Sequence, residues 1–409
     1  MRYSLTQSTS EVAERPLGEG AHAPTLLEPS HSPEFANREP PADLSRSVYC
    51  VLGMPIDAID MLTVVDRIEA AATNRSAFLI STPNAHFLVN GRSDPEFRDS
   101  LLDSDLCPPD GMPIVWIARS LGLPIRERIA GADILEWLRA AGRCARQFRV
   151  FLFGGAEGVA AAAARTLSAE PSSLNCVGTF DPGFAEVGEM SQDHIIDAVN
   201  SSDADFLVVC LGAKKGQLWL HRNHKRLTIP IRAHLGAAIN FQAGIVKRAP
   251  PKVRASGLEW LWRIKEEPHL WRRYWNDGCV LLRLLLTRVL PLLIETQLHR
   301  FRSKHQARDL LIEMTRNYQS TVIRLRGVAT EKHIGNAITC FQDALARKQN
   351  VMIIDLSETR LIDARFLGLL LMLRKQLKAQ EAKLIFTGVS RAIERMFRLN
   401  ELGYLLSAT

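Results

Sequence analysis

The sequence predicts an α/β protein with a Rossmann-like doubly wound domain, a basic amphipathic helical segment and then a second, smaller α/β domain. Short apolar runs alternate with amphipathic stretches from about 47 to 274 and again from about 317 to 409, which is typical of parallel βαβ units. The 409 residues are enough for two or three domains. With 46% hydrophobic and 23% charged residues, the composition excludes a wholly disordered or small disulfide-stapled protein.

Residues 1–46 are expected to form a disordered tail. They contain six of the twenty prolines and six glutamates, and Tyr3 and Phe35 are their only aromatic residues. Such a segment buries too little apolar surface to offset the entropy lost on folding. No basic stretch leads into an apolar run at the start, so we expect no secretory signal. The seven cysteines lie far apart and form no CxxC pair, which favours a reducing compartment and gives no zinc or redox motif.

Within the first domain, 47–275, each apolar run is predicted to be a buried strand. Helical patterns at 131–144, 158–169 and 192–201 lie between the runs. Several runs end in Gly or Asn, and ligands of doubly wound sheets bind at the carboxyl ends of the strands. We therefore expect the chemistry at that edge of the sheet. The predicted strands are 76–82, 149–155, 174–180, 205–212 and 231–236.

Segment 276–316 is predicted to be an amphipathic, membrane-associating helix followed by a linker. Its apolar run, 278–294, is interrupted by Arg283, Arg288 and Pro291. A bilayer span needs roughly 20 apolar residues and a central arginine costs about 2.5–3.5 kcal/mol, so a helix in the membrane plane or packed on protein is favoured. Residues 246–308 carry fourteen Lys/Arg against five Asp/Glu in a chain of net charge +7, so an anionic partner is expected there.

The second domain, 317–409, repeats the alternation on a smaller scale. The runs 321–327, 351–357 and 383–389 are predicted strands. The stretches 335–347, 366–380 and 391–402 are predicted helices.

Two polar stretches are candidate sites, one directly after the apolar run 76–82 and one in the proline-rich loop 107–113. Thr82 and Asn84 could hydrogen-bond sugar hydroxyls or phosphates, or could form an Asx turn that only ends the strand. Asp110 lies between Pro109 and Gly111, where a rigid loop could hold a general base. The alternative for Asp110 is a turn residue that caps the next helix.

Two glycine-containing loops could approach phosphate groups. Gly154 and Gly155 precede a predicted helix without the spacing of a dinucleotide site, so a nucleoside diphosphate is the better interpretation. Lys214 and Lys215 are placed on a loop where they could neutralise a diphosphate, and Gln217 could bind an uncharged sugar. A solvated basic turn is the alternative.

The stretch 247–275 combines aromatic and basic residues. It holds four of the seven tryptophans among eight lysines and arginines. This mixture suits either nucleic acid or a membrane interface, and the apolar helix that follows favours the membrane. We expect no nucleic-acid partner.

Several of these stretches occur together in a known order: TPNAHF (82–87), PPDGMPIVW (108–116), RIAGADIL (128–135), VFLFGG (150–155), VVCLGA (208–213), GAAINFQAGIVKRAP (236–250) and GLEWLWRIKEEPHLWRRY (257–274). In this the sequence resembles the WecG/TagA/CpsF glycosyltransferases. The resemblance implies an inverting enzyme that transfers a sugar from a nucleotide donor, commonly a UDP-sugar, to a polyprenyl-diphosphate-linked glycan at the inner face of the cytoplasmic membrane. It implies surface-polysaccharide synthesis, with neither a cofactor nor a bound metal.

The resemblance also suggests roles for individual residues. Asp110 matches the catalytic base, and Thr82, Asn84 and Arg128 match substrate-binding positions, to which we add Gln217 and Asn240. The family's basic element, thought to grip the lipid diphosphate, matches Arg254, Arg263, Arg272 and Arg273, and we add Lys214 and Lys215 to this group.

Two stretches depart from the family pattern. The frequent GxPKQE reads with Gly216 in place of glutamine and Gln217 in place of glutamate, and the aspartate of FDF is Asn240. These changes are expected either to redirect donor choice, for instance to a uronate or hexose in place of an N-acetylhexosamine, or to mark lost activity. The rival function is a non-catalytic scaffold that binds a glycolipid.

The stretch 351–376 looks like part of a STAS domain, the fold of anti-sigma factor antagonists. The phosphorylated serine of that pattern is replaced by Ala364, after Asp363, so no serine phosphoswitch is available there. We expect this domain to contact a protein partner or its own transferase domain through Arg365 and Phe366. The whole protein is expected to be cytoplasmic and attached peripherally to the membrane.

Overall fold

The computed structural model describes residues 42–409, apart from 141–143, 145, 170–171, 237, 304–308, 318–319 and 408–409. Most of the predicted tail, 1–41, lies outside the described residues. Its last residues do not fit the expectation of disorder, because Ala42–Ser45 form helix α1 and Leu44 is fully buried. Disorder is therefore a wrong prediction for 42–46.

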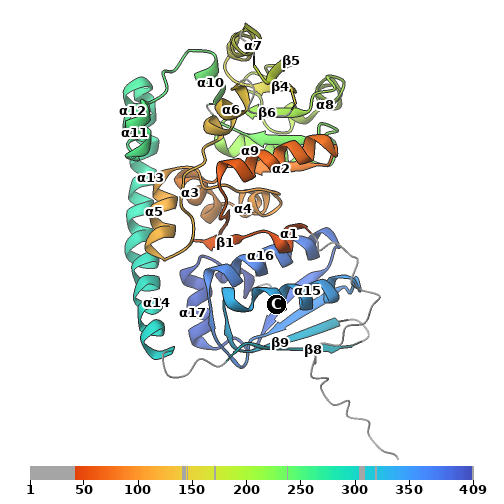
Figure 1. Cartoon of the computed structure of the whole chain (residues 1–409), viewed down its shortest axis with the longest axis vertical. Helices are drawn as coiled ribbons and strands as arrows, with labels where there is room; N and C mark the ends of the chain where they lie inside the picture. The colour runs from red at the N-terminus through yellow and green to blue at the C-terminus, as the bar shows by residue number, and fades with distance from the viewer. Residues whose placement is uncertain are drawn as a thin grey trace, which may run out of the picture.

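A five-stranded parallel sheet forms the centre of the first domain (Figure 1). Its order, β3-β7-β6-β4-β5, confirms the predicted Rossmann-like, doubly wound arrangement. Strands β6 and β7 are buried along their whole length. The sequence of β6, FLVVC, is accordingly apolar throughout, whereas β7, IRAH, buries Arg232 and His234. The strands are β3 (Phe78–Ser81), β4 (Phe148–Gly154), β5 (Leu174–Phe180), β6 (Phe206–Cys210) and β7 (Ile231–His234).

Helices cover both faces of this sheet. One face packs against α2 (Met61–Thr73), α6 (Gly131–Arg139), α7 (Val159–Ala169) and α10 (Ala238–Gln242). The other packs against α8 (Asp193–Asn200) and α9 (Ala213–Asn223). Because α7 follows β4 and α9 follows the neighbouring β6, the chain leaves these two strands toward opposite faces. This is the topological switch point, where doubly wound sheets bind ligands.

A hairpin and three helices extend the first domain toward the second. Strands β1 (Val48–Val51) and β2 (Met54–Asp57) are antiparallel and fully buried. They share one apolar cluster with three helices and with side chains from later in the chain, including Leu284 and Leu399. The helices are α3 (Ala85–Ser93), α4 (Pro95–Leu102) and α5 (Met112–Ser120).

Residues 251–303 form a helical column along one side of the molecule, at the left of Figure 1. No helix in the described part of the chain is both long and apolar enough to cross a bilayer. Exposed apolar side chains line the column at Trp271, Trp275, Leu282, Leu286, Leu290 and Ile294. The column comprises α11 (Pro251–Ala255), α12 (Glu259–Glu266), α13 (Trp271–Leu284), a π-helical turn η4 (Leu285–Val289) and α14 (Leu290–Ser303).

The π-helical turn keeps these apolar side chains on one face. At about 100° per residue, an uninterrupted α-helix would turn Ile294 about 140° away from Trp271. A π-helical turn takes up one extra residue and so reverses about 100° of that rotation. The stripe from Trp271 to Ile294 is therefore nearly straight.

The second domain is a mixed sheet with three principal helices. Strands β9 (Ser320–Ala329), β10 (Val351–Asp355), β11 (Thr359–Ile362) and β12 (Lys383–Thr387) are parallel, and β8 (Leu311–Arg316) pairs antiparallel with β9. Because β8 belongs to this sheet, the second domain begins by Leu311, and its predicted start at 317 is too late. The helices are α15 (Ile334–Leu345), α16 (Ala364–Ala379) and α17 (Arg391–Leu399).

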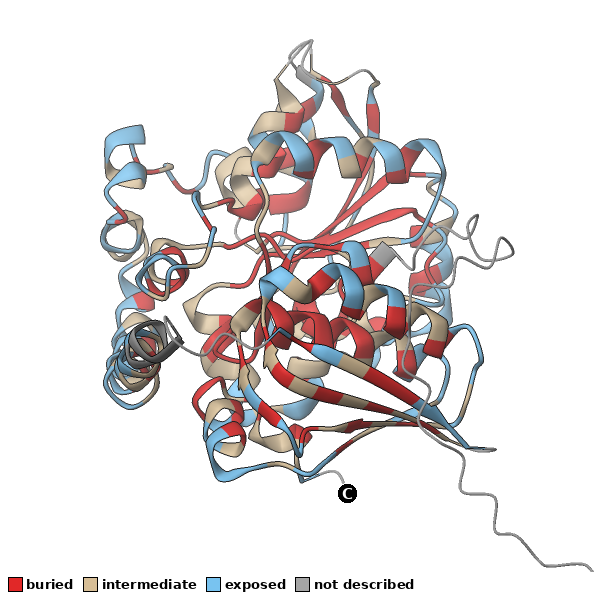
Figure 2. Ribbon diagram, turned by 60° about the horizontal axis from the view of Figure 1, so that its bottom comes forward, coloured by how far each residue is buried: buried red, intermediate tan, exposed pale blue. Residues whose placement is uncertain are grey.

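The two domains share an apolar core. Helix α16 packs on β1, and residues 365–373 of α16 are all buried. Figure 2 shows buried residues in the strands of the first sheet and in the helices between the two sheets. Arg365 donates hydrogen bonds to the backbone oxygens of Val48 (3.1 Å) and Arg46 (3.0 Å). The surface predicted to contact a partner or the first domain therefore contacts the first domain through Arg365. Phe366 belongs to the apolar core that residues of both domains form.

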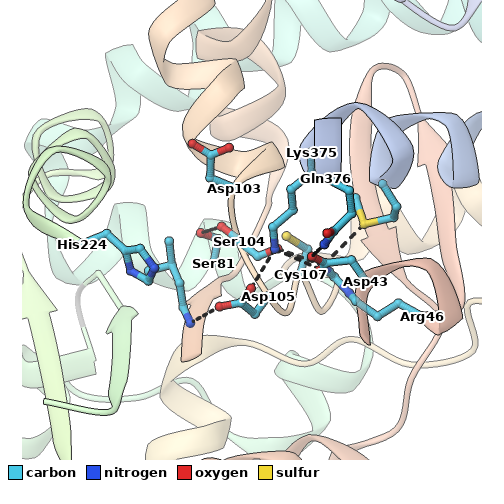
Figure 3. A network of polar contacts seen from close by, with 12 residues as sticks. Asp43, Arg46, Ser81, Asp103, Ser104, Asp105, Cys107, His224, Lys375 and Gln376 are labelled. Carbon is cyan, nitrogen blue, oxygen red and sulfur yellow. Dashed lines mark hydrogen bonds and ion pairs between the residues drawn. The ribbon is translucent and has the colours of Figure 1, made fainter. Parts of the chain in front are cut away.

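A buried polar network also joins the domains (Figure 3). Arg46 donates to both carboxylate oxygens of Asp57, at 3.2 and 2.7 Å, and to the backbone oxygen of Ser104 at 2.9 Å. Lys375 of α16 pairs with Asp43 at 2.9 Å and with Asp105 at 2.7 Å. Because these charges are removed from water and paired with one another, separating the domains would leave several of them without partners.

Candidate active site

Asp110 and Asn84 lie side by side at the carboxyl edge of the first sheet. Leu106 forms a parallel bridge with Ile80 of β3, so both chain segments leave the sheet in the same direction. The Asp110 backbone N–H donates to the backbone oxygen of Pro83 at 2.9 Å. The structure thus brings together two polar stretches that are separate in the sequence, with Thr82 buried beside them.

Asn84 has two roles. Its amide oxygen accepts hydrogen bonds from the backbone N–H groups of His86 (3.0 Å) and Phe87 (3.1 Å), which caps α3. The same side chain hydrogen-bonds the Asp110 carboxyl group. Since the amide oxygen serves the cap, the amide nitrogen is the group that donates to Asp110. The Asx-type alternative is therefore confirmed for Asn84, and its contact with a substrate stays a prediction.

The pKa of the Asp110 carboxyl group lies close to neutral pH. Removal from water is the largest effect and raises the pKa of its carboxyl group to about 7, with Asp133 and Glu259 adding repulsion. Arg128 and the hydrogen bond from Asn84 act in the opposite direction. A carboxyl group with a pKa near the working pH is suited to accept a proton from a substrate hydroxyl.

Arg128 belongs to a cluster of ion pairs next to Asp110. It donates to Asp133 at 2.8 Å and to Glu259 of α12 at 2.6 Å. Asp133 also pairs with Arg248 and, at 3.3 Å, with Arg254 of α11. The beginning of the column is thereby joined to the loop before α6 and to α6 itself.

A second link joins the column to α3. The Nδ1 atom of His86 lies 3.0 and 3.1 Å from the two carboxylate oxygens of Asp277, which is buried on α13. His86 is in the stretch TPNAHF, but sequence reasoning passed over it and over Asp277. A lone histidine and a lone aspartate 191 residues apart give no local signal that they are paired.

Residues 49–293, more than half of the chain, match the family described as Glycosyl transferase WecG/TagA/CpsF. The chain belongs to this family. Residues 312–407 match a second family, described as Mlab, STAS domain. The protein is thus a WecG/TagA/CpsF glycosyltransferase fused to a STAS domain.

Curated relatives cover the transferase part. The chain is similar to the N-acetylglucosaminyldiphosphoundecaprenol N-acetyl-beta-D-mannosaminyltransferase of Bacillus spizizenii, at 27% identity over 49% of this chain and 75% of the relative. The enzyme of the same name from Bacillus subtilis is 25% identical over 48% of this chain and 74% of its own length. A solved structure of the phosphorylated Bacillus cell fate determinant SpoIIAA matches 24% of this chain and 88% of that chain, at 20% identity and a TM-score of 0.21.

The lysines expected on a loop of the transferase lie on a helix. Lys214 and Lys215 belong to the first turn of α9. Lys214 pairs with Asp94 at 2.8 Å, and Lys215 pairs with Glu186 at 2.8 Å. Both side chains remain partly exposed near the switch point, but in this structure each has a carboxylate partner. The predicted loop placement is wrong.

Gln217 and Gly216 are packed inside the transferase domain. Gln217 is fully buried and donates to Ser81 (2.7 Å) and to the backbone oxygen of Ser100 (3.3 Å), so it does not lie where a sugar could reach it. A Cβ atom at Gly216 would lie 2.2 Å from the His234 ring. The departure from the family's glutamine is therefore explained by packing, because only glycine leaves room for His234.

Glycine is also required at the end of β4. Gly154 has a φ of +97°, and a Cβ atom there would lie 2.8 Å from the Leu211 side chain and 3.0 Å from the backbone oxygen of Cys210. Gly155 follows with a φ of +102°. The two carboxyl ends at the switch point, after β4 and β6, can approach each other only because the backbone at Gly154 carries no side chain.

The remaining predicted residues lie on or next to the column. Asn240, on α10, is partly exposed and precedes Phe241, whose ring centre lies 5.9 Å from the guanidinium carbon of Arg248 and 5.3 Å from that of Arg263. Arg263 also pairs with Glu267. Arg272 and Arg273 are exposed, each over a neighbouring aromatic ring, Trp271 and Tyr274. Among the described residues, no three His, Cys, Asp or Glu side chains are arranged to hold a metal ion.

Proposed function

We propose that this glycosyltransferase moves a sugar from a nucleotide-sugar donor to a polyprenyl-diphosphate-linked glycan, with inversion at the anomeric carbon. The names of the two Bacillus relatives support the acceptor class, since both enzymes act on N-acetylglucosaminyldiphosphoundecaprenol. The donor sugar is an N-acetylhexosamine, a uronate or a hexose. The product belongs to the synthesis of a bacterial surface polysaccharide.

The environment of Asp110 is the observation that carries this proposal. The carboxyl group lies at the carboxyl edge of the sheet, is held by Asn84 and has a pKa of about 7. As the acceptor hydroxyl attacks the anomeric carbon, Asp110 takes the hydroxyl proton. The bond from that carbon to the donor diphosphate breaks, and the nucleoside diphosphate leaves with the electron pair.

We place the donor diphosphate between the switch point and the arginine cluster. Gly154 and Gly155 allow backbone N–H groups to approach a phosphate after β4. Arg128, next to Asp110, supplies a cation for the charge that develops on the leaving group. Thr82 and Asn84 line the same edge.

We further propose that the helical column rests on the inner surface of the cytoplasmic membrane. The exposed stripe from Trp271 to Ile294 carries two tryptophans and four aliphatic side chains, with Arg272, Arg273 and Arg283 exposed nearby. Tryptophan and arginine are suited to the depth of lipid headgroups. Contact with the membrane would bring Asp110 close to the diphosphate of a lipid-linked acceptor.

Any protein partner of the STAS domain would bind elsewhere than on the start of α16. The transferase domain occupies that surface through Arg365 and through the packing of α16 on β1.

The purified protein can be tested with a panel of UDP- and GDP-sugars and a short polyprenyl-diphosphate-linked acceptor. Wild type is expected to form the glycosylated lipid with at least one donor, which would also raise its melting temperature. Asp110→Asn is expected to lower turnover by about 10²–10⁴-fold with the fold retained. Unchanged turnover in Asp110→Asn would overturn the assignment of Asp110 as the base, and the absence of transfer with every donor would favour the scaffold.

A further inference from the structure

One carboxylate at the start of α6 meets three arginines. Asp133 Oδ2 accepts from Arg128 at 2.8 Å and from the backbone N–H of Ala130 at 3.2 Å. Its other oxygen, Oδ1, accepts from Arg248 and, at 3.3 Å, from Arg254. The three arginines come from different segments, the loop before α6, the loop before α11 and α11 itself, and are brought together only by folding.

We propose that Asp133 is a positioning residue whose carboxylate gathers Arg128, Arg248 and Arg254 into a cradle for a diphosphate beside Asp110. This inference rests on the proposed function and adds to it a residue, Asp133, that would not itself touch the substrate. It also adds Arg248 to the residues that would bind the diphosphate.

Three neighbouring guanidinium groups repel one another unless an anion lies between them. Asp133 supplies that anion and leaves donors free, because a guanidinium has five N–H groups and the contacts to Asp133 use only one from each arginine. The Nε atoms of Arg248 and Arg254 are buried and have no hydrogen-bond partner within the described part of the chain. Planar groups held in fixed positions with unused donors are suited to phosphate oxygens.

The Asp133 carboxylate also affects the pKa of Asp110, the proposed base. The groups that act on Asp110 are Arg128, Asp133 at the start of α6, Glu259 of α12 and Asn84 before α3. Asp133 raises the pKa of Asp110 and Arg128 lowers it. Replacing Asp133 by asparagine would remove the repulsion and free Arg128 to approach Asp110, and both changes lower that pKa.

Glu136 offers a matched control. It pairs with the same two arginines, Arg248 and Arg254, but is 53% exposed and is not among the largest influences on Asp110. Glu136→Gln therefore removes one carboxylate from the same arginines without removing the one that joins all three.

The experiment measures binding of two probes to the full-length protein by calorimetry. UDP tests the donor as the source of the diphosphate, and farnesyl diphosphate tests the lipid acceptor. Asp133→Asn is expected to weaken binding of at least one probe by about tenfold to a hundredfold, and Glu136→Gln by much less. The probe that is affected identifies the source.

Carbon-13 NMR of labelled aspartate gives a second readout that a purely structural role would not move. The midpoint of the Asp110 titration is expected at lower pH in Asp133→Asn and unchanged in Glu136→Gln. If Asp133→Asn fails to fold, Arg248→Gln replaces it in the calorimetry and is expected to show the same loss. A folded Asp133→Asn protein with wild-type affinity for both probes would overturn the proposal, whether or not sugar transfer has been detected.

Discussion

At the scale of single residues, Asp110 shows how a reactive carboxyl group affects stability. Its pKa is raised to about 7, mainly by removal from water, so the folded state favours the protonated form. In the unfolded chain the carboxyl group ionises near its ordinary value, about 4. Stability from this group is therefore fully present below pH about 4, falls as pH rises and is lost above pH about 7.

The amide side chain of the Asp110→Asn variant cannot ionise, so its stability does not fall in this way as pH rises. We expect the variant to be more stable than wild type at pH 8 and the difference to vanish at pH 4, as measured by urea unfolding across that range. Asp197→Asn, at an exposed position on α8, is the control and should follow wild type throughout. Equal stability of Asp110→Asn and wild type at pH 8 would mean that the carboxyl group does not carry the raised pKa.

At the scale of elements, the π-helical turn η4 makes the exposed apolar face of the column continuous. The apolar residues of α13 and α14 share one face only because η4 takes up an extra residue between them. An exposed apolar face of this length on a single helix marks a binding surface, and the neighbouring arginines favour an anionic one.

Trp275→Asp and Leu286→Asp place charges in the middle of this stripe. The double variant is expected to lose most of its binding to anionic liposomes in a sedimentation assay, because both apolar burial and attraction to the surface are reduced. Leu62→Asp, on an exposed leucine of α2, is the control for an acidic residue placed outside the stripe and should bind like wild type. Wild-type binding is also expected to weaken with salt. Salt-independent retention of the double variant would exclude the stripe as the contact.

Sequence reasoning predicted most strands from their apolar runs and missed others, including β8 and the fully buried β1. The strands of the first sheet were found from their short apolar runs, including β5, which is only partly buried. Strand β8 was missed because its sequence, LIEMTR, contains Glu313 and Arg316 at the edge of a sheet. Lys214 and Lys215 were assigned to a loop because Gly212 and Gly216 flank them, yet Gly216 lies inside α9 to make room for His234.

The site was predicted in part for a similar reason. Motif order identified Asp110, Asn84 and Arg128, which the structure places together. Asp133 lies within the motif RIAGADIL, but its role, like that of Asp277, depends on partners more than a hundred residues distant, Arg248 and His86. The burial of Gln217 likewise follows from packing between elements and not from its own loop.

At the scale of the whole molecule, the STAS domain is part of the structure of the transferase. Leu44, Val48 and Cys50 belong to the core of the second domain, and Glu401 pairs with Arg92 of α3 and Arg288 of the column. Removal of the STAS domain would expose this core and release the column. A truncated transferase is therefore not expected to be a stable, active fragment.

Gly368→Ala tests the contact between the domains with a single methyl group. A Cβ atom at Gly368 would lie 2.1 Å from the backbone oxygen of Val48, so one element must move, and we expect a loss of about 1–3 kcal/mol in thermal or urea unfolding. Gly335→Ala, on α15 of the same domain, has no atom within 4 Å and is expected to be neutral or stabilising by up to about 1 kcal/mol. Equal stability of the two variants would show that α16 and β1 are not in close contact.

The contact between Arg365 and Val48 can form only long after Val48 has been synthesised. The two residues are 317 positions apart, and at 5–20 residues per second the ribosome makes that length in roughly 16–63 s. For this time α1 and β1 have no helix to cover them, and Leu44 and Val48 are open to other chains. Chaperone depletion in the cell is therefore expected to damage this fusion protein during translation, before its STAS domain has left the ribosome.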